Sequence, residues 1–242
     1  MAYVWQTWLA TALRAEGCTV REYTGWTSRG RPSSTGGYAP YAVGMHHTGT
    51  RTSSSNPHPT LSAIVNGRAD LPGPLAAGLI GYDGVVDLVA AGRCNHGGQA
   101  RSTGPMPSGD ANYLYVGFEI DYDGTQPMSS AQHQAAVRAA AAVLRHFGKP
   151  SSYARQHNEW STTGKWDCGG WDNDGMRAEI AAQLGSGGDD VTSPTDVVGA
   201  DSDGSNLTMG ELSARMNWLY QQWLSLGSLK AQLNRIEEAL RK

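Results

Sequence analysis

The chain has 242 residues, a formal net charge of -3, 31 glycines and eight tryptophans. This length suits one domain with a sizeable core plus an appendage, since single domains usually have about 100 to 200 residues. The slightly acidic balance provides no overall positive field, so we expect no binding of nucleic acid. No stretch approaches the roughly 20 apolar residues of a membrane span, so we expect no insertion into a membrane.

The first segment, "MAYVWQTWLATALRAEG", places apolar residues at helical spacing and predicts an amphipathic helix. It has neither the basic start nor the uninterrupted apolar stretch of a signal peptide, so we expect synthesis in the cytoplasm. The three cysteines, Cys18, Cys94 and Cys168, are odd in number and far apart. They therefore predict no disulfide framework.

The middle of the chain alternates strand and helix patterns. "YAVGMHHTGT" predicts a short strand that ends in two histidines, and the apolar runs on either side of "GYDG" predict a hairpin. "YLYVGFEIDYDG" predicts a buried strand with acidic residues at its exit. A helix capped by Ser129 or Ser130 and ended by Gly148 follows, then a strand at "SYARQH" and a helix around "DGMRAEIAAQL". Together they predict an α/β domain with a mixed central β-sheet flanked by helices.

The composition changes at Gly185. We predict a domain over residues 1–184, an acidic linker rich in Gly, Ser and Thr over 185–208, and an amphipathic helix over 209–242. The apolar residues of that helix have nearly heptad spacing, which is typical of a coiled coil. It could pack on a second copy, on the first domain or on another partner. We favour a homo-oligomer formed through residues 209–242.

Histidines and an acidic residue in separate segments are candidate zinc ligands. A catalytic zinc site needs three protein ligands and an open fourth position for water. The candidates are His46 and His47 after the first strand, His157 after a later strand, and Asp167 or Cys168 in "HNEWSTTGKWDCGG". The residue types alone leave the choice between these last two open.

Four segments resemble, in the same order, the zinc-dependent N-acetylmuramoyl-L-alanine amidases of type 2, which share their fold with peptidoglycan recognition proteins. They are "VGMHHTGT", "GLIGYDGVVDLVAAGRCNHGG", "YVGFEID" and "HNEW" with "GKWDCGGW". Four segments in order are more specific than one, and the resemblance covers about residues 20–184. It implies a hydrolase that cleaves the amide bond between N-acetylmuramic acid and L-alanine of the peptidoglycan stem peptide, with Zn²⁺ as cofactor.

The resemblance also assigns the metal ligands. The first and second fall on His46 and His157. The third falls on Asp167, because Lys165 and Asp167 follow His157 by eight and ten residues, as in the family's "KxDPG" pattern. Cys168 stands where that pattern has Pro and is the alternative ligand. His47 would point to the other side of its strand and have a structural role.

The remaining site residues follow from the same resemblance. Glu119 corresponds to the family's catalytic Glu and would act as general base and acid. Lys165 would stabilise the oxyanion of the tetrahedral intermediate. His96 corresponds to a family histidine near the substrate, so His96 and its neighbour Asn95, which replaces a Trp of the family, are predicted to bind substrate.

The resemblance extends to the biological setting. The segments "GRCNHGG" and "PSGDANYLYVGFE" are most similar to endolysins of bacteriophages that infect actinobacteria. This implies a protein made in the host cytoplasm without a signal peptide, which reaches the cell wall after holin-dependent release. A peptidoglycan-binding module of the same fold without catalysis is the alternative function. We favour an enzyme, because such modules typically lack a ligand or a catalytic residue and this chain has all of them.

Overall fold

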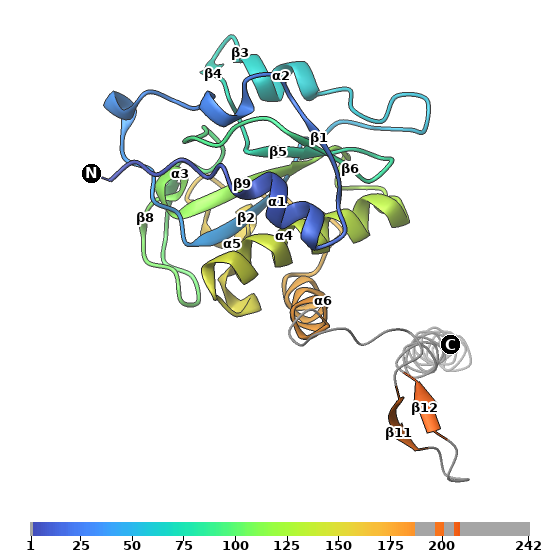
Figure 1. Cartoon of the computed structure of the whole chain (residues 1–242). Coiled ribbons are helices and arrows are strands. Elements are labelled where there is room, and N and C mark those ends of the chain that lie inside the picture. The colour runs from blue at the N-terminus through green and yellow to red at the C-terminus, as the bar shows by residue number, and fades with distance from the viewer. Residues whose placement is uncertain (1, 187–196, 201–205, 209–242) are drawn as a thin grey trace, which may run out of the picture. The chain divides into compact units, whose positions relative to one another are not determined.

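The computed structural model describes residues 2–186, 197–200 and 206–208 (Figure 1). The chain forms two units, Met1–Gly188 and Asp189–Lys242. In the first unit a six-stranded sheet is flanked by helices, which confirms the predicted α/β class with a mixed central sheet. Within the described residues, no helix is both long and apolar enough to cross a membrane.

Two groups of strands with opposite directions make up the sheet. Its spatial order is β1 (Thr19–Glu22), β6 (Val85–Leu88), β5 (Gly78–Ile80), β9 (Tyr115–Ile120), β2 (Ala42–His47) and β10 (Ala154–Gln156). β5, β9, β2 and β10 are mutually parallel, whereas β6 is antiparallel to β5 and parallel to β1. The β5–β6 pair is the hairpin predicted around "GYDG".

One face of the sheet packs against α4 (Ser130–Phe147), which in turn contacts α1 (Leu9–Ala15) and α6 (Asn173–Gly185). The Ser129 hydroxyl accepts a hydrogen bond from the backbone N–H of Gln132 at 3.0 Å, and Gly148 ends α4 with a φ of 61°. Both ends of α4 therefore match the prediction. Its buried face is mostly alanine, so the helix can approach the strands closely.

The opposite face of the sheet is covered by short elements (Figure 1). They are α2 (Leu61–Asn66), β3 (Gly67–Arg68), β4 (Leu71–Pro72), β7 (Gln99–Ala100), β8 (Gly109–Asp110), α3 (Ala111–Leu114) and α5 (His157–Trp160). These elements pack through two smaller apolar clusters, separate from the main core under α4. The loops between them leave room for a cleft at the carboxyl ends of the parallel strands.

The N-terminal helix is shorter than predicted. It begins at Leu9, and Thr7 and Trp8 before it form a turn. The backbone N–H of Val4 donates to the carbonyl of Tyr38 at 2.6 Å, and that of Gln6 donates to the carbonyl of Ala91 at 2.8 Å. Pairing with neighbouring loops thus replaces the first helical turn, and Val4 is 49% exposed despite its place in the apolar pattern.

Two short strands lie within the segment predicted as a linker. β11 (Val197–Ala200) and β12 (Asn206–Thr208) pair in antiparallel orientation. The preceding helix, α6, ends at Gly185, where the composition of the chain changes. The helix predicted over residues 209–242 lies outside the described residues.

Candidate metal centre and active site

The candidate site lies where three parallel strands end. His46 is on β2, Glu119 is its register partner on β9, and His157 directly follows β10, the other neighbour of β2. Parallel strands present their carboxyl ends at one edge of a sheet, where ligands bind in open α/β folds. The topology therefore brings together residues that are up to 111 positions apart in the sequence.

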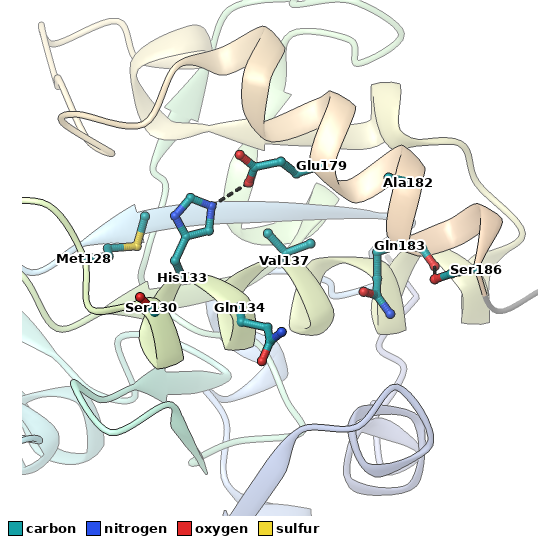
Figure 2. Close-up of a pocket in the computed structure, with 9 residues that line it drawn as sticks. All are labelled: Met128, Ser130, His133, Gln134, Val137, Glu179, Ala182, Gln183 and Ser186. Atoms are coloured by element: carbon teal, nitrogen blue, oxygen red, sulfur yellow. Dashed lines mark hydrogen bonds and ion pairs between the residues drawn. The ribbon is translucent and has the colours of Figure 1, made fainter. Parts of the chain in front are cut away.

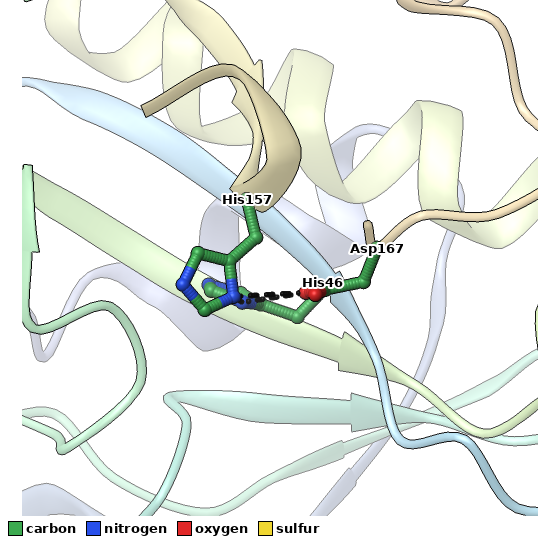
Figure 3. A group of neighbouring side chains, drawn as sticks. All are labelled: His46, His157 and Asp167. Atoms are coloured by element: carbon green, nitrogen blue, oxygen red, sulfur yellow. Dashed lines mark hydrogen bonds and ion pairs between the residues drawn. The ribbon is translucent and has the colours of Figure 1, made fainter. Parts of the chain in front are cut away.

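Three ligand atoms converge at this edge (Figure 3). Nδ1 of His46 lies 3.1 Å from Nδ1 of His157, and Oδ2 of Asp167 lies 3.0 Å from His157 Nδ1 and 3.3 Å from His46 Nδ1. Zinc bonds of about 2.0 to 2.1 Å in a tetrahedron place neighbouring ligand atoms about 3.3 Å apart. The three atoms thus fit one face of a zinc tetrahedron, whose fourth corner would be open.

The charge states of these side chains also suit a metal. Burial lowers the pKa of His46 to about 4, so its ring is neutral at physiological pH. Burial alone would raise the pKa of Asp167, but its contacts with His157 and His46 hold it below the usual range. A neutral imidazole and an ionised carboxylate are the forms that bind metal ions.

Gln156, at the end of β10, holds the segment that carries Asp167. Its side-chain oxygen accepts from the N–H of Cys168 at 2.9 Å, and its amide nitrogen donates to the carbonyl of Trp171 at 2.8 Å. The N–H of Asn158 also donates to the carbonyl of Asp167 at 2.9 Å. Sequence patterns did not point to Gln156, because a glutamine in a strand is not distinctive.

Cys168 lies outside the group of ligand atoms. Its side chain is buried in the main core, and burial raises the pKa of its thiol well above the ordinary value. The Asp167–Cys168 peptide bond is cis. Of the two adjacent candidates, the structure brings only Asp167 to the two histidines.

His47, the second histidine of the pair, contacts the turn that follows Asp167. Its Nδ1 accepts a hydrogen bond from the N–H of Gly169 at 3.1 Å, and its ring packs on Trp166 with the ring centres 4.4 Å apart. This contact is consistent with the structural role predicted for it. His47 also lines the cleft beside the metal group.

A cleft of about 300 Å³ opens beside the three ligand atoms. Glu119 and Lys165 both line it, as do His157 and Asp167. Oε2 of Glu119 is buried and has no hydrogen-bond partner among the described residues. Burial, together with the carboxylates of Asp167 and Asp121, raises the pKa of Glu119 well above its ordinary value. A raised pKa favours a carboxyl group that takes up and releases a proton during a reaction.

One wall of the cleft is fixed by Asp121, two residues after Glu119. Its carboxylate accepts from the hydroxyls of Thr48 at 2.8 Å and Thr60 at 2.9 Å, and from the N–H of Thr60 at 3.2 Å. Both threonines line the cleft. The acidic exit of this strand was visible in the sequence, but the threonines that it binds were not.

The two residues predicted to bind substrate do not line the cleft. His96 is buried, and its Nδ1 lies 3.0 Å from Nε2 of His46. The side-chain nitrogen of Asn95 donates to the carbonyl of Pro72 at 2.7 Å, which ties the loop to β4. Four of the seven predicted site residues thus line the cleft, and His46 joins two of them in the metal group, whereas His96 and Asn95 belong to neither.

A larger pocket, of about 630 Å³, lies between α4 and α6 (Figure 2). Nε2 of His133 and Oε2 of Glu179 form a hydrogen bond of 2.5 Å across it. None of the predicted site residues lines this pocket. Its position among the helices on the α4 side of the sheet separates it from the metal group.

Comparison with known proteins identifies the family of this chain. Residues 36–170 match the family described as N-acetylmuramoyl-L-alanine amidase, and this match contains all seven predicted site residues. The chain belongs to this family. Family membership supports a peptidoglycan hydrolase. No curated protein sequence matches the chain.

Several solved structures resemble this amidase-family chain at low sequence identity. The Staphylococcus aureus hydrolase AmiA in complex with its ligand is 14% identical, with a TM-score of 0.49 over 76% of this chain and 94% of that one. The endolysin amidase LysCS of Clostridium intestinale is 12% identical, with a TM-score of 0.46 over 67% and 95%. The Drosophila peptidoglycan recognition protein SA is 19% identical, with a TM-score of 0.42 over 60% and 84%.

Proposed function

We propose that the protein is a zinc-dependent N-acetylmuramoyl-L-alanine amidase that cleaves the amide bond between N-acetylmuramic acid and L-alanine of the stem peptide. Its partner is thus peptidoglycan. Family membership supports the reaction class. The observation that carries the zinc-dependent mechanism is the convergence of His46, His157 and Asp167 beside a buried, unpartnered carboxyl oxygen of Glu119.

The metal group and Glu119 would have separate roles in hydrolysis. The chemistry that zinc supplies when bound is activation of a water molecule and polarisation of the scissile carbonyl. Glu119 takes the proton from the attacking water and delivers it to the leaving nitrogen, because an amine leaves poorly unless it is protonated. Its raised pKa and its place in register with His46 support this role.

Lys165 would act on the charge that forms during the reaction. It lines the same cleft as Glu119 and Asp167, and its side chain is exposed. An ammonium group at the carbonyl oxygen stabilises the oxyanion of the tetrahedral intermediate more than the neutral substrate, which lowers the barrier. The hydroxyls of Thr48 and Thr60 on the adjoining wall donate to Asp121, so their oxygens would accept hydrogen bonds from N–H groups of the peptide.

The test is digestion of purified peptidoglycan by the zinc-loaded full chain. Cleavage at the proposed bond releases stem peptides with a free N-terminal L-alanine, identified by mass spectrometry and end-group labelling. Lys165→Met should lower the rate and leave bound zinc unchanged. Binding without release, under conditions where a known amidase releases alanine, would instead favour the peptidoglycan-binding module without catalysis.

We propose further that the protein acts as a bacteriophage endolysin on actinobacterial walls after holin-dependent release from the host cytoplasm. Support comes from the resemblance of "GRCNHGG" and "PSGDANYLYVGFE" to such lysins. The test is expression in an actinobacterial host with and without a holin. Lysis should require both proteins, and lysis by the chain alone would contradict holin dependence.

Self-association through residues 209–242 is the third part of the proposal. Support comes from the apolar residues of this segment at nearly heptad spacing. Light scattering on the full chain should give a mass above that of one chain. Leu219→Glu combined with Leu233→Glu should return the mass to that of a monomer, and an unchanged mass would refute assembly through this segment.

A further inference from the structure

His96 is a buried histidine that the proposed mechanism does not use. Its ring has one side-chain hydrogen-bond partner, because Nδ1 lies 3.0 Å from Nε2 of His46 and the two rings meet edge to face at 80°. Its other nitrogen, Nε2, is buried and has no partner among the described residues. His96 does not line the cleft.

The surroundings hold His96 in place. A Cβ atom on Gly117, two residues before Glu119 on the same face of β9, would lie 2.5 Å from the His96 ring. Glycine at this position therefore allows the ring to lie directly on the sheet. The side-chain oxygen of Asn112 accepts from the N–H groups of both His96 and Gly97 at 2.8 Å, which fixes the backbone of the loop.

The two nitrogens of His46 have different partners. Nδ1 faces His157 and Asp167, whereas Nε2 faces His96. A neutral imidazole that binds a metal through one nitrogen carries its proton on the other, and the partner of that second nitrogen selects the tautomer and the ring orientation. Histidine ligands usually donate to a carboxylate, a backbone carbonyl or water. Here the group within hydrogen-bond distance of Nε2 is the Nδ1 of another histidine, which can accept when it carries no proton.

We propose that His96 is a positioning residue for the metal: it accepts a hydrogen bond from Nε2 of His46 and so directs Nδ1 of His46 at the zinc ion. The inference rests on the proposed zinc site. It replaces the predicted substrate-binding role of His96. The ring of Trp160, which contacts the rings of both His46 and His157, supports the same arrangement from the side.

The test is the zinc affinity of the full chain, measured without peptidoglycan by competition with a chromophoric chelator. His96→Leu should weaken zinc binding about 10- to 100-fold, as loss of an outer partner of a ligand typically does. His96→Asn keeps an acceptor oxygen near the position of Nδ1 and should bind within a few-fold of wild type, by the same reasoning. His58→Leu is the matched control, because His58 is a buried histidine paired with Asp83 and Asp87. It should leave the zinc affinity unchanged.

Three outcomes would overturn the inference. Wild-type affinity in His96→Leu would show that the hydrogen bond does not matter, and equal losses in His96→Leu and His96→Asn would assign the effect to packing. If His96→Leu does not fold, nitrogen-15 NMR of the zinc-loaded wild type decides, and a His46 ring protonated on Nδ1 would refute the proposal. Failure of wild type to bind zinc at all would instead refute the proposed function.

Discussion

Strands β2 and β9 present two different surfaces. Toward α4 they place large apolar side chains, of which Met45 and Phe118 are completely buried. Toward the cleft the same strands place Gly44 and His46, and Gly117 and Glu119. On the α4 side, the side chains of the strands themselves fill the space above the sheet. On the cleft side, side chains from other segments of the chain fill it. We call these surfaces the core face and the site face.

The two glycines of the site face have the same structural role. A Cβ on Gly44 would lie 2.9 Å from the ring of Trp160, and one on Gly117 would lie 2.5 Å from the ring of His96. Each glycine thus makes room for an aromatic ring that packs behind the metal ligands. Burial of apolar side chains stabilises the core face. The site face buries less apolar surface, because its residues position functional groups instead.

The largest effect is expected from a substitution of Glu119, on the site face, which should lower activity without lowering stability. Glu119→Gln keeps the shape of the side chain and removes the group that transfers protons, so the rate of alanine release should fall about 10²- to 10⁴-fold. Thermal unfolding should show a protein at least as stable as wild type, because a buried carboxyl group without a partner is lost. A rate within twofold of wild type would remove Glu119 from the mechanism.

The neighbouring residue on the core face should behave in the opposite way. Phe118→Ala removes a fully buried ring, and the free energy of unfolding should fall by about 3 to 5 kcal/mol, measured by denaturant titration. Activity per folded molecule should remain near wild type, since the side chain points toward α4. A selective loss of activity with unchanged stability would contradict the division into two faces.

Much of this division was accessible from the sequence. The side-chain alternation of a strand indicated that His46 and His47 point to different sides, and the caps of α4 were predicted from Ser129 and Gly148. The resemblance supplied the metal ligands and Glu119. The contact of His96 with His46 was not predicted, because spacing along the chain says nothing about which loop folds over a glycine. The start of α1 was misplaced because apolar spacing does not reveal backbone pairing with distant loops.

The adjacent residues Asp167 and Cys168 differ in the same way as the two faces. Asp167 belongs to the metal group, whereas Cys168 belongs to the core. Asp167→Ala should weaken zinc binding more than about 100-fold, because losing a ligand costs more than losing its outer partner. Cys168→Ser should keep the zinc affinity and lower the stability. The zinc content of each variant after dialysis against a metal buffer measures its zinc affinity. Loss of zinc in Cys168→Ser but not in Asp167→Ala would make Cys168 the ligand.

The smallest effect should come from a single methyl group on the site face. Gly117→Ala forces the His96 ring to move, which should lower the free energy of unfolding by about 1 to 3 kcal/mol, as overpacking typically does. The zinc affinity should fall in the same variant if His96 positions His46. Gly185→Ala, at the open end of α6 with no atom within 4 Å of the added carbon, is the matched control. Equal stability of both variants would show that the ring is not held against the sheet.

The most direct test of the central claim is a zinc titration of the metal-free protein, followed by the rate at which N-terminal L-alanine appears on purified peptidoglycan. The account predicts no release without metal and a rate that rises in proportion to bound zinc, with a plateau at about one equivalent, since the described site holds one set of three ligands. Full activity in the metal-free protein, or no release at one bound equivalent, would contradict it.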